Sequence, residues 1–206
     1  MNYSTVCILA QALLSKYNMS ENHIVLNKSI PTDMIWKCLP DPSTIECPYG
    51  IARYWCNFSE INLLQKTLQI KEPILMATLF KLPPQSLGII HVDKHFFYEQ
   101  IYDNVAINLP LSPNNGTYMS WYRQNDPTKT YRDFGRAQKT VPKIEPDDCT
   151  KIESYEVKLP HVVKINDWHN IDNFSDTEFG YILSMRFDRE LSFDDLIKLT
   201  EHWPNL

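Results

Sequence analysis

Short apolar segments separated by turn residues follow one another from Pro73 onward, and this pattern restricts the chain to a β architecture. The segments are 74–80, 87–92, 105–111 and 118–122, followed by 154–159, 162–165 and 180–187. Strands of this length and spacing are typical of antiparallel sandwiches and barrels. Asn114-Asn115-Gly116 predicts a hairpin turn between two of them, because asparagine and glycine tolerate positive φ.

Helices are expected at the flanks of this β region. Residues 6–17 place Val6, Leu9, Leu13 and Leu14 at helical spacing. A second helix should begin at Ser59 and Glu60, and a third at Ser192 and Asp195, where the spacing matches a capping box.

These elements predict a single domain over residues 1–206. Within it, residues 1–73 are expected to form a helical and irregular flank, in which prolines interrupt the stretch 27–49. Residues 74–190 should form the β core, and residues 191–206 a C-terminal helix.

Composition excludes several classes of protein. Hydrophobic residues make up 43% and charged residues 22% of the chain, which argues against disorder. The net charge of −5 does not favour nucleic acid as a partner. Five cysteines without a Cys-x-x-Cys pair indicate reduced thiols and no structural zinc site. No apolar run is long enough to span a membrane and no signal peptide is evident, so we expect a cytoplasmic protein without a membrane partner.

A histidine and a carboxylate end the segment 87–92. Side chains on an extended chain repeat every second residue, so His91 and Asp93 should point to the same side. His169 lies further along the chain, and Arg186 follows it within an apolar run. Two imidazoles and one carboxylate are the ligands that hold non-haem Fe(II) while leaving coordination positions open.

The chain resembles the Fe(II)- and 2-oxoglutarate-dependent dioxygenase superfamily, and in particular a poorly characterised branch of it. The resemblance covers about residues 74–188 and rests on three segments, His91-Val92-Asp93, Asp167-Trp168-His169-Asn170 and Leu183-Ser184-Met185-Arg186-Phe187, with 106–110 and 118–122 between them. It implies a double-stranded β-helix, or jelly roll, mainly β with flanking helices. It also implies Fe(II) bound by His91, Asp93 and His169, with 2-oxoglutarate as cosubstrate.

Three further residues are expected to bind the cosubstrate. Arg186 offers a permanently charged fork that suits the far carboxylate of 2-oxoglutarate. Ser184 lies two residues earlier on the same face and could donate to that carboxylate. Asn108 is a candidate for a cosubstrate contact or, equally, for a structural hydrogen bond. His161 is the alternative third metal ligand, and His95 a candidate for supporting the metal ligands.

We therefore expect an oxygenase, and specifically a hydroxylase, that uses the small-molecule cosubstrate and O₂. The alternative is a non-catalytic jelly-roll binding or structural module in which Arg186 pairs with an acidic side chain. A zinc hydrolase is a poorer option, since no glutamate is placed as a general base. The substrate is not readable, but two groups are candidates for contacting it. They are the aromatic residues Tyr118, Trp121, Tyr122 and Tyr131, for which core packing is the competing explanation, and the basic residues Arg123, Arg132, Arg136 and Lys139.

Overall fold

The computed structural model describes most of the chain beyond its first residues. The described residues are 20, 22–48, 50–93, 96–97, 100–101, 105–112, 116–129, 133–134, 141–187 and 191–206. The helix predicted over 6–17 lies outside them, as do His95, Tyr131, Arg132, Arg136 and Lys139.

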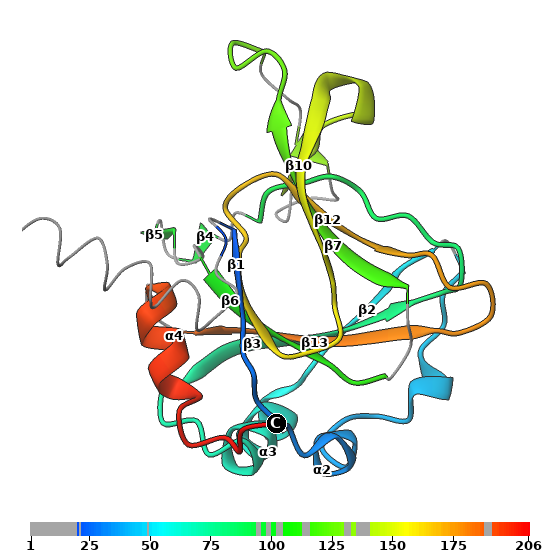
Figure 1. The fold of residues 1–206 in the computed structure, drawn as a ribbon. Coiled ribbons are helices and arrows are strands. Elements are labelled where there is room, and N and C mark those ends of the chain that lie inside the picture. Colours follow the sequence, from blue (N-terminus) through cyan, green and yellow to red (C-terminus); the bar gives the residue numbers. More distant parts are fainter. Residues whose placement is uncertain are drawn as a thin grey trace, which may run out of the picture.

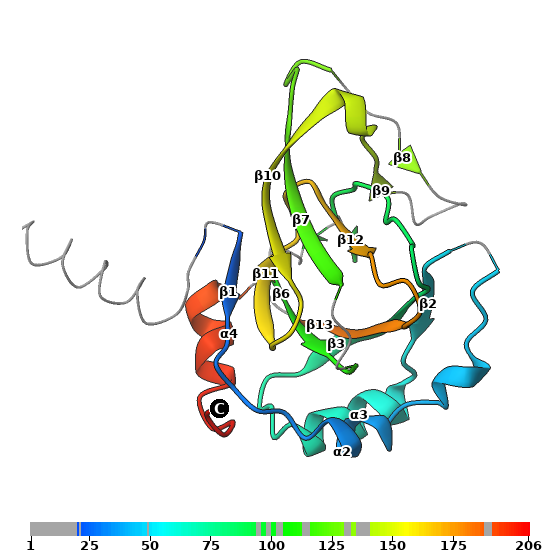
Figure 2. The same cartoon turned by 45° about the vertical axis from the view of Figure 1, so that its right-hand side comes forward.

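Two antiparallel sheets face each other across a shared interior (Figures 1 and 2). The larger sheet has the order β1-β11-β6-β13-β3-β2, with the bounds β1 His23–Val25, β11 His161–Lys164, β6 Val105–Pro110, β13 Gly180–Phe187, β3 Ile74–Leu82 and β2 Ala52–Trp55. The smaller sheet has the order β10-β7-β12, with the bounds β10 Cys149–Glu156, β7 Thr117–Gln124 and β12 His169–Asn173. Two short pairs complete the strands, β4 Phe96–Phe97 with β5 Gln100–Ile101 and β8 Asp133–Phe134 with β9 Val141–Pro142.

The chain crosses repeatedly from one sheet to the other. It passes from β6 in the larger sheet to β7 in the smaller one, and from β10 in the smaller sheet through β11, β12 and β13 it alternates between the two. A cluster that includes Leu82, Ala106, Trp121, Val163 and Ile182 fills part of the space between them. This winding is the double-stranded β-helix, so the predicted fold class, mainly β with flanking helices, is confirmed.

The alternation makes the predicted hairpin wrong. β6 pairs with β11 and β13, whereas β7 pairs with β10 and β12. The connection through Asn114, Asn115 and Gly116 therefore crosses from one sheet to the other. Gly116 has a φ of 118°, as the turn composition predicts, and residues 113–115 lie outside the described part of the chain.

The helices cover the outer face and one edge of the larger sheet. α2 spans Thr32–Trp36, α3 Phe58–Thr67 and α4 Phe193–Leu199, and two 3-10 turns lie at Pro42–Thr44 and Pro146–Asp148. Figure 2 shows α2 and α3 beneath this sheet, where Ile35 and Leu64 join its outer core. The predicted cap at Ser59 is wrong, because the cap is Asn57, which forms a capping box with Glu60. The predicted capping box of Ser192 and Asp195 is confirmed.

The predicted strand at 87–92 is also not a regular strand. This segment pairs with β12 only at its ends, through the bridges Ser86↔Asn173 and His91↔His169. The step from Ser86 to His91 is one residue longer than the facing step, so the ladder is interrupted between them. Gly88 lies in this interruption, where a Cβ atom would lie 2.2 Å from the carbonyl oxygen of Ile171. The close approach of two backbones therefore requires glycine here.

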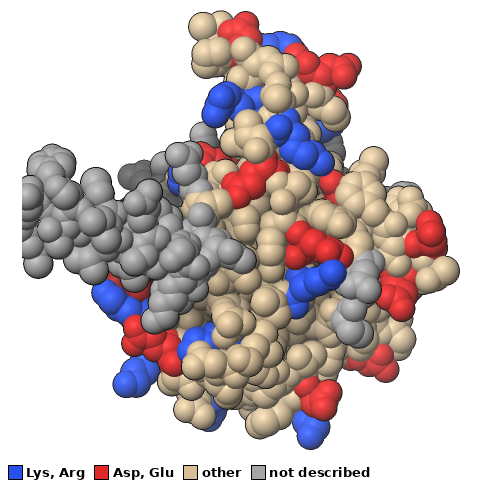
Figure 3. Space-filling model, viewed as in Figure 1, with Lys and Arg blue, Asp and Glu red and all other residues tan. Residues whose placement is uncertain are grey.

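Charges of both signs are interspersed over the face shown in Figure 3, without a basic patch. None of the helices in the described part of the chain has the length and apolar character needed to cross a membrane.

Candidate metal centre

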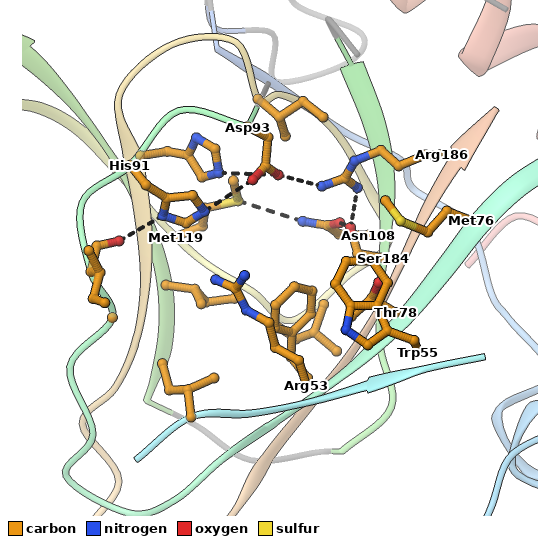
Figure 4. Close-up of a pocket in the computed structure, with 18 of the residues that line it drawn as sticks. Arg53, Trp55, Met76, Thr78, His91, Asp93, Asn108, Met119, Ser184 and Arg186 are labelled. Atoms are coloured by element: carbon orange, nitrogen blue, oxygen red, sulfur yellow. Dashed lines mark hydrogen bonds and ion pairs between the residues drawn. The ribbon is translucent and has the colours of Figure 1, made fainter. Parts of the chain in front are cut away.

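A cavity of about 410 Å³ opens between the two sheets (Figure 4). Its polar end consists of His91, Asp93, Asn108, His169, Ser184 and Arg186. The rest of its wall is mostly apolar and comes from β2, β3, β7, β12, β13 and the segment 87–89. Apart from Arg53 and Thr78, the polar groups are concentrated at one end of a mostly apolar wall, which is a usual composition of a small-molecule site.

His91 and His169 are direct partners across two chain segments. The backbone N–H of each donates to the carbonyl of the other, at 2.9 Å in both directions. Opposite residues in an antiparallel pair project to the same face. The two imidazoles accordingly lie side by side, with ring centroids 4.6 Å apart.

A backbone carbonyl fixes the orientation of each imidazole. His91 Nδ1 lies 2.8 Å from the carbonyl oxygen of Ile89, and His169 Nδ1 lies 2.8 Å from that of Asp167. Because a carbonyl only accepts hydrogen bonds, both Nδ1 atoms carry the proton. A ring that is neutral with its proton on Nδ1 has its lone pair on Nε2, which is the arrangement of a histidine that ligates a metal through Nε2.

Asp93 completes the group. Its backbone N–H donates to the carbonyl of Ile165 at 2.9 Å, which fixes the backbone two residues after His91. Its carboxylate oxygens lie 3.2 Å from His91 Nε2 and 3.9 Å from His169 Nε2. One potential ligand atom from each of the three residues lies within 4.8 Å of the others, so His91, Asp93 and His169 form the triad.

The electrostatics of the triad suit a bound cation. Burial raises the pKa of Asp93, but the hydrogen bond and charge of His91, together with Arg186, outweigh it and hold the pKa well below its usual range. Burial, together with the charge of His91, lowers the pKa of His169 to about 4, so this imidazole is neutral near pH 7. Unprotonated Nε2 atoms repel a carboxylate unless a proton or a metal ion lies between them. A divalent metal ion would therefore fit these donors.

The three residues predicted to bind cosubstrate form a chain of hydrogen bonds that ends on the triad. Asn108 and Ser184 are cross-strand partners on β6 and β13, and the Ser184 hydroxyl donates to Asn108 Oδ1. Arg186 donates through Nη1 to Ser184 and through Nη2 to Asp93 Oδ2, the latter at 2.7 Å. The structure thus places Asn108, Ser184 and Arg186 at the triad. Their binding of a cosubstrate stays a prediction.

His161, the alternative ligand, does not belong to the triad. It is fully buried and lies next to Tyr155, and its Nδ1 contacts the carbonyl oxygen of Leu159 at 3.1 Å. Burial lowers the pKa of His161 to about 3. Of the predicted aromatic group, Trp121 is a fully buried core residue and Tyr118 packs against Phe174, so neither lines the cavity.

Sequence reasoning missed two residues of the cavity wall, Arg53 and Trp55 on β2. The sequence Ala52–Trp55 shows no strict alternation of apolar and polar residues, so no signal marked this strand, and its alternating burial is seen only in the structure. This strand lies within residues 1–73, which were expected to be helical and irregular. The sequence therefore did not indicate that one face of the strand lines the cavity.

A scan against protein-family models found no match to this sequence, and a search of curated proteins found none either. Among solved structures, the chain is similar to HygX from Streptomyces hygroscopicus with nickel and 2-oxoglutarate bound. The identity is 9%, the TM-score is 0.46, and the match covers 95% of this chain and 94% of the other.

The chain is also similar to an oxalate decarboxylase from Bacillus subtilis, with 9% identity and a TM-score of 0.36 over 72% of this chain. It spans only 28% of that enzyme. At these values neither likeness bears on what this chain binds or does.

Proposed function

We propose that the protein is an Fe(II)- and 2-oxoglutarate-dependent oxygenase that hydroxylates a small molecule. The observation that carries the proposal is the triad of His91, Asp93 and His169 at the polar end of a cavity of about 410 Å³. Two imidazoles and one carboxylate are the ligand set of non-haem Fe(II) oxygenases, and they leave coordination positions for cosubstrate and O₂.

The side chains around the triad would bind and orient the reactants. When bound, the iron would activate O₂. The reaction would convert substrate R–H, 2-oxoglutarate and O₂ into R–OH, succinate and CO₂, in which all atoms balance. Ile89 and Asp167 would keep the two Nε2 atoms directed at the metal by holding both Nδ1 protons. Arg186, with Ser184 and Asn108 behind it, lies where it could contact the cosubstrate carboxylate while keeping Asp93 ionised.

Burial of the polar end supports this assignment. Asp93 and His169 are buried, and the wall near them includes Met119, Ile165 and Ile171. An apolar wall limits the access of bulk water to the reacting atoms and strengthens charge interactions inside the cavity. Both effects favour oxidation of the bound substrate.

The test is an anaerobic titration of the protein with Fe(II) and 2-oxoglutarate, followed by visible absorption. A chelate of the cosubstrate on the iron gives a weak charge-transfer band, and we expect this band in the wild type. His91→Ala and Asp93→Ala should abolish it, whereas Arg123→Gln, a surface variant on β7, should retain it. Absence of the band in the wild type, or its persistence in His91→Ala, would contradict the proposal.

One observation favours the alternative, a jelly-roll binding module without metal chemistry. Arg186 pairs with Asp93, which is the pairing expected if the arginine serves the fold instead of a cosubstrate. The two candidates differ in metal affinity. If the protein is a module, the wild type and His169→Ala should bind Co(II) or Mn(II) equally weakly. If it is an oxygenase, His169→Ala should lose most of the metal affinity of the wild type.

A further inference from the structure

Arg53 and Trp55 turn toward the cavity because of the strand on which they lie. Side chains on β2 alternate, and Ala52 and Tyr54 pack against the outer core of the larger sheet. Arg53 and Trp55 therefore face the other side, where both line the cavity. Figure 4 shows them entering the pocket from the side opposite Asp93 and Arg186.

The partner strand holds Arg53 in place without neutralising its charge. Arg53 is opposite Phe80 on β3, and its guanidinium carbon lies 5.4 Å from the centre of the Phe80 ring. A cation over an aromatic face is stabilised and keeps its charge. Within the described part of the chain, Arg53 has no hydrogen bond or ion pair with an acidic side chain.

No carboxylate of the cavity wall pairs with Arg53, which is an exposed residue and therefore solvated until a ligand covers it. Among the described residues that line the cavity, Asp93 is the only carboxylate, and it already pairs with Arg186. A divalent ion on the triad would add further positive charge. The cavity therefore favours an anion, although the whole chain carries a net charge of −5.

The size of the cavity limits what such an anion can be. About 410 Å³ lies near the lower end of the range for small-molecule sites, roughly 300–1,000 Å³. Cosubstrate and substrate would share this volume, so the space suits a compact substrate. Trp55, whose side chain is 41% exposed, and Phe80 provide flat apolar surface beside the guanidinium.

We propose that the primary substrate is a small carboxylic acid whose carboxylate binds Arg53 and whose apolar body lies against Trp55 and Phe80. This assignment rests on the proposed function, because that function makes the occupant a substrate. An arginine fork matches a carboxylate in geometry as well as in charge. The metal triad and Arg53 would hold the two reactants at opposite sides of one cavity.

The experiment compares acids with their uncharged amides as probes. The probes are 4-methylpentanoate, 3-phenylpropanoate and the two corresponding amides, and saturation-transfer NMR measures their binding to protein loaded with Zn(II) and 2-oxoglutarate. A hydrogen bond to a charged group is stronger than one between neutral groups, so we expect at least one acid to bind about tenfold or more tightly than its amide. Arg53→Gln should remove this preference, and Arg123→Gln should keep it, since Arg123 carries the same charge outside the cavity wall.

Three outcomes would overturn the assignment of Arg53. They are binding of neither acid, equal binding of acids and amides, and an acid preference that survives Arg53→Gln. Loss of 2-oxoglutarate affinity in Arg53→Gln would also overturn it, because Arg53 would then belong to the cosubstrate site. The Fe(II) charge-transfer band of the wild type is measured separately. If this band is absent while the preference for acids is intact, the proposed oxygenase function is contradicted, but the assignment of Arg53 as a carboxylate-binding residue is retained.

Discussion

Arg186 donates a hydrogen bond of 2.7 Å to Asp93, although 93 residues separate the two along the chain. Arg186 belongs to β13 of the larger sheet, whereas Asp93 follows His91, which pairs with β12 of the smaller sheet. Both side chains are buried. A single ion pair therefore joins the two sheets at the triad, and several predictions concern the groups around it.

Removal of the arginine should destabilise the protein more than removal of a surface arginine. In Arg186→Gln the carboxylate of Asp93 stays buried without its cationic partner, and breaking a buried pair costs about 3–5 kcal/mol. Urea unfolding of metal-free protein near neutral pH measures the difference, with Arg123→Gln as the matched control. If Arg186→Gln loses no more unfolding free energy than Arg123→Gln, solvent or a rearranged side chain must stabilise the charge of Asp93 in place of the arginine.

Replacement of a triad histidine should remove metal affinity with little effect on the fold. His169→Ala leaves only one imidazole and one carboxylate in the triad. Groups that merely hydrogen-bond to a metal ligand contribute roughly 10–100-fold to metal affinity. We therefore expect the loss of a ligand itself to lower the affinity for Co(II) by about 100-fold or more. Calorimetric titration measures the affinity. His202→Ala is the control, because His202 bonds the carbonyl of Leu68 away from the cavity. Equal affinities in the two variants would exclude His169 as a ligand.

A methyl group at position 88 should displace the chain segment that carries His91. The Cβ of Gly88→Ala would lie 2.2 Å from the carbonyl oxygen of Ile171, and backbone atoms on β12 cannot turn aside as a side chain can. We expect a loss of about 1–3 kcal/mol in unfolding free energy, as for other overpacked positions. Metal affinity should fall as well, since His91 lies three residues further on the same segment. Ile152→Ala, at a residue that is 46% exposed and does not line the cavity, should leave both measurements unchanged.

His161 should make the metal-free protein acid-sensitive. Its folded pKa is about 3, below its value in the unfolded chain of about 6.5. The unfolded state thus takes up the proton first, and stability falls as the pH decreases from about 6.5 toward 3. At about pH 4.5 this one group should account for a loss of about 3 kcal/mol.

The comparison of His161→Leu with the wild type isolates this contribution. Urea unfolding at about pH 7 and about pH 4.5 should show a smaller acid loss in the variant. Glu153 and His23 remain in both proteins, so their contribution cancels. An identical acid loss in both proteins would contradict the assignment.

The long strands could be predicted from sequence because each contains a run of apolar residues that is recognisable by itself. β13 has the predicted bounds, and β3 extends only slightly beyond the predicted segment, since both are rich in apolar residues. β12 was not predicted, because its sequence His169–Asn173 is polar. Its side chains are nevertheless buried, since Asn170 and Asp172 bond to each other and to Gly88.

The triad could be predicted because its residue types and order carry chemical information. The residues that contact the triad or face it across the cavity could not be predicted in this way. The pairing of Arg186 with Asp93 depends on how two sheets approach each other, which no local pattern records. Arg53 reaches the cavity only because β2 adds to the edge of the larger sheet, and a strand of four residues has too few positions to reveal its partner.

Asp93 contacts His91 on one side and Arg186 on the other, so an ion bound there would connect both halves of the β-helix at their interface. Loading would then slow hydrogen exchange in β12 and β13 together, in spite of their separate hydrogen-bond ladders. The supply of this metal would thereby set how long each copy of the protein survives proteolysis.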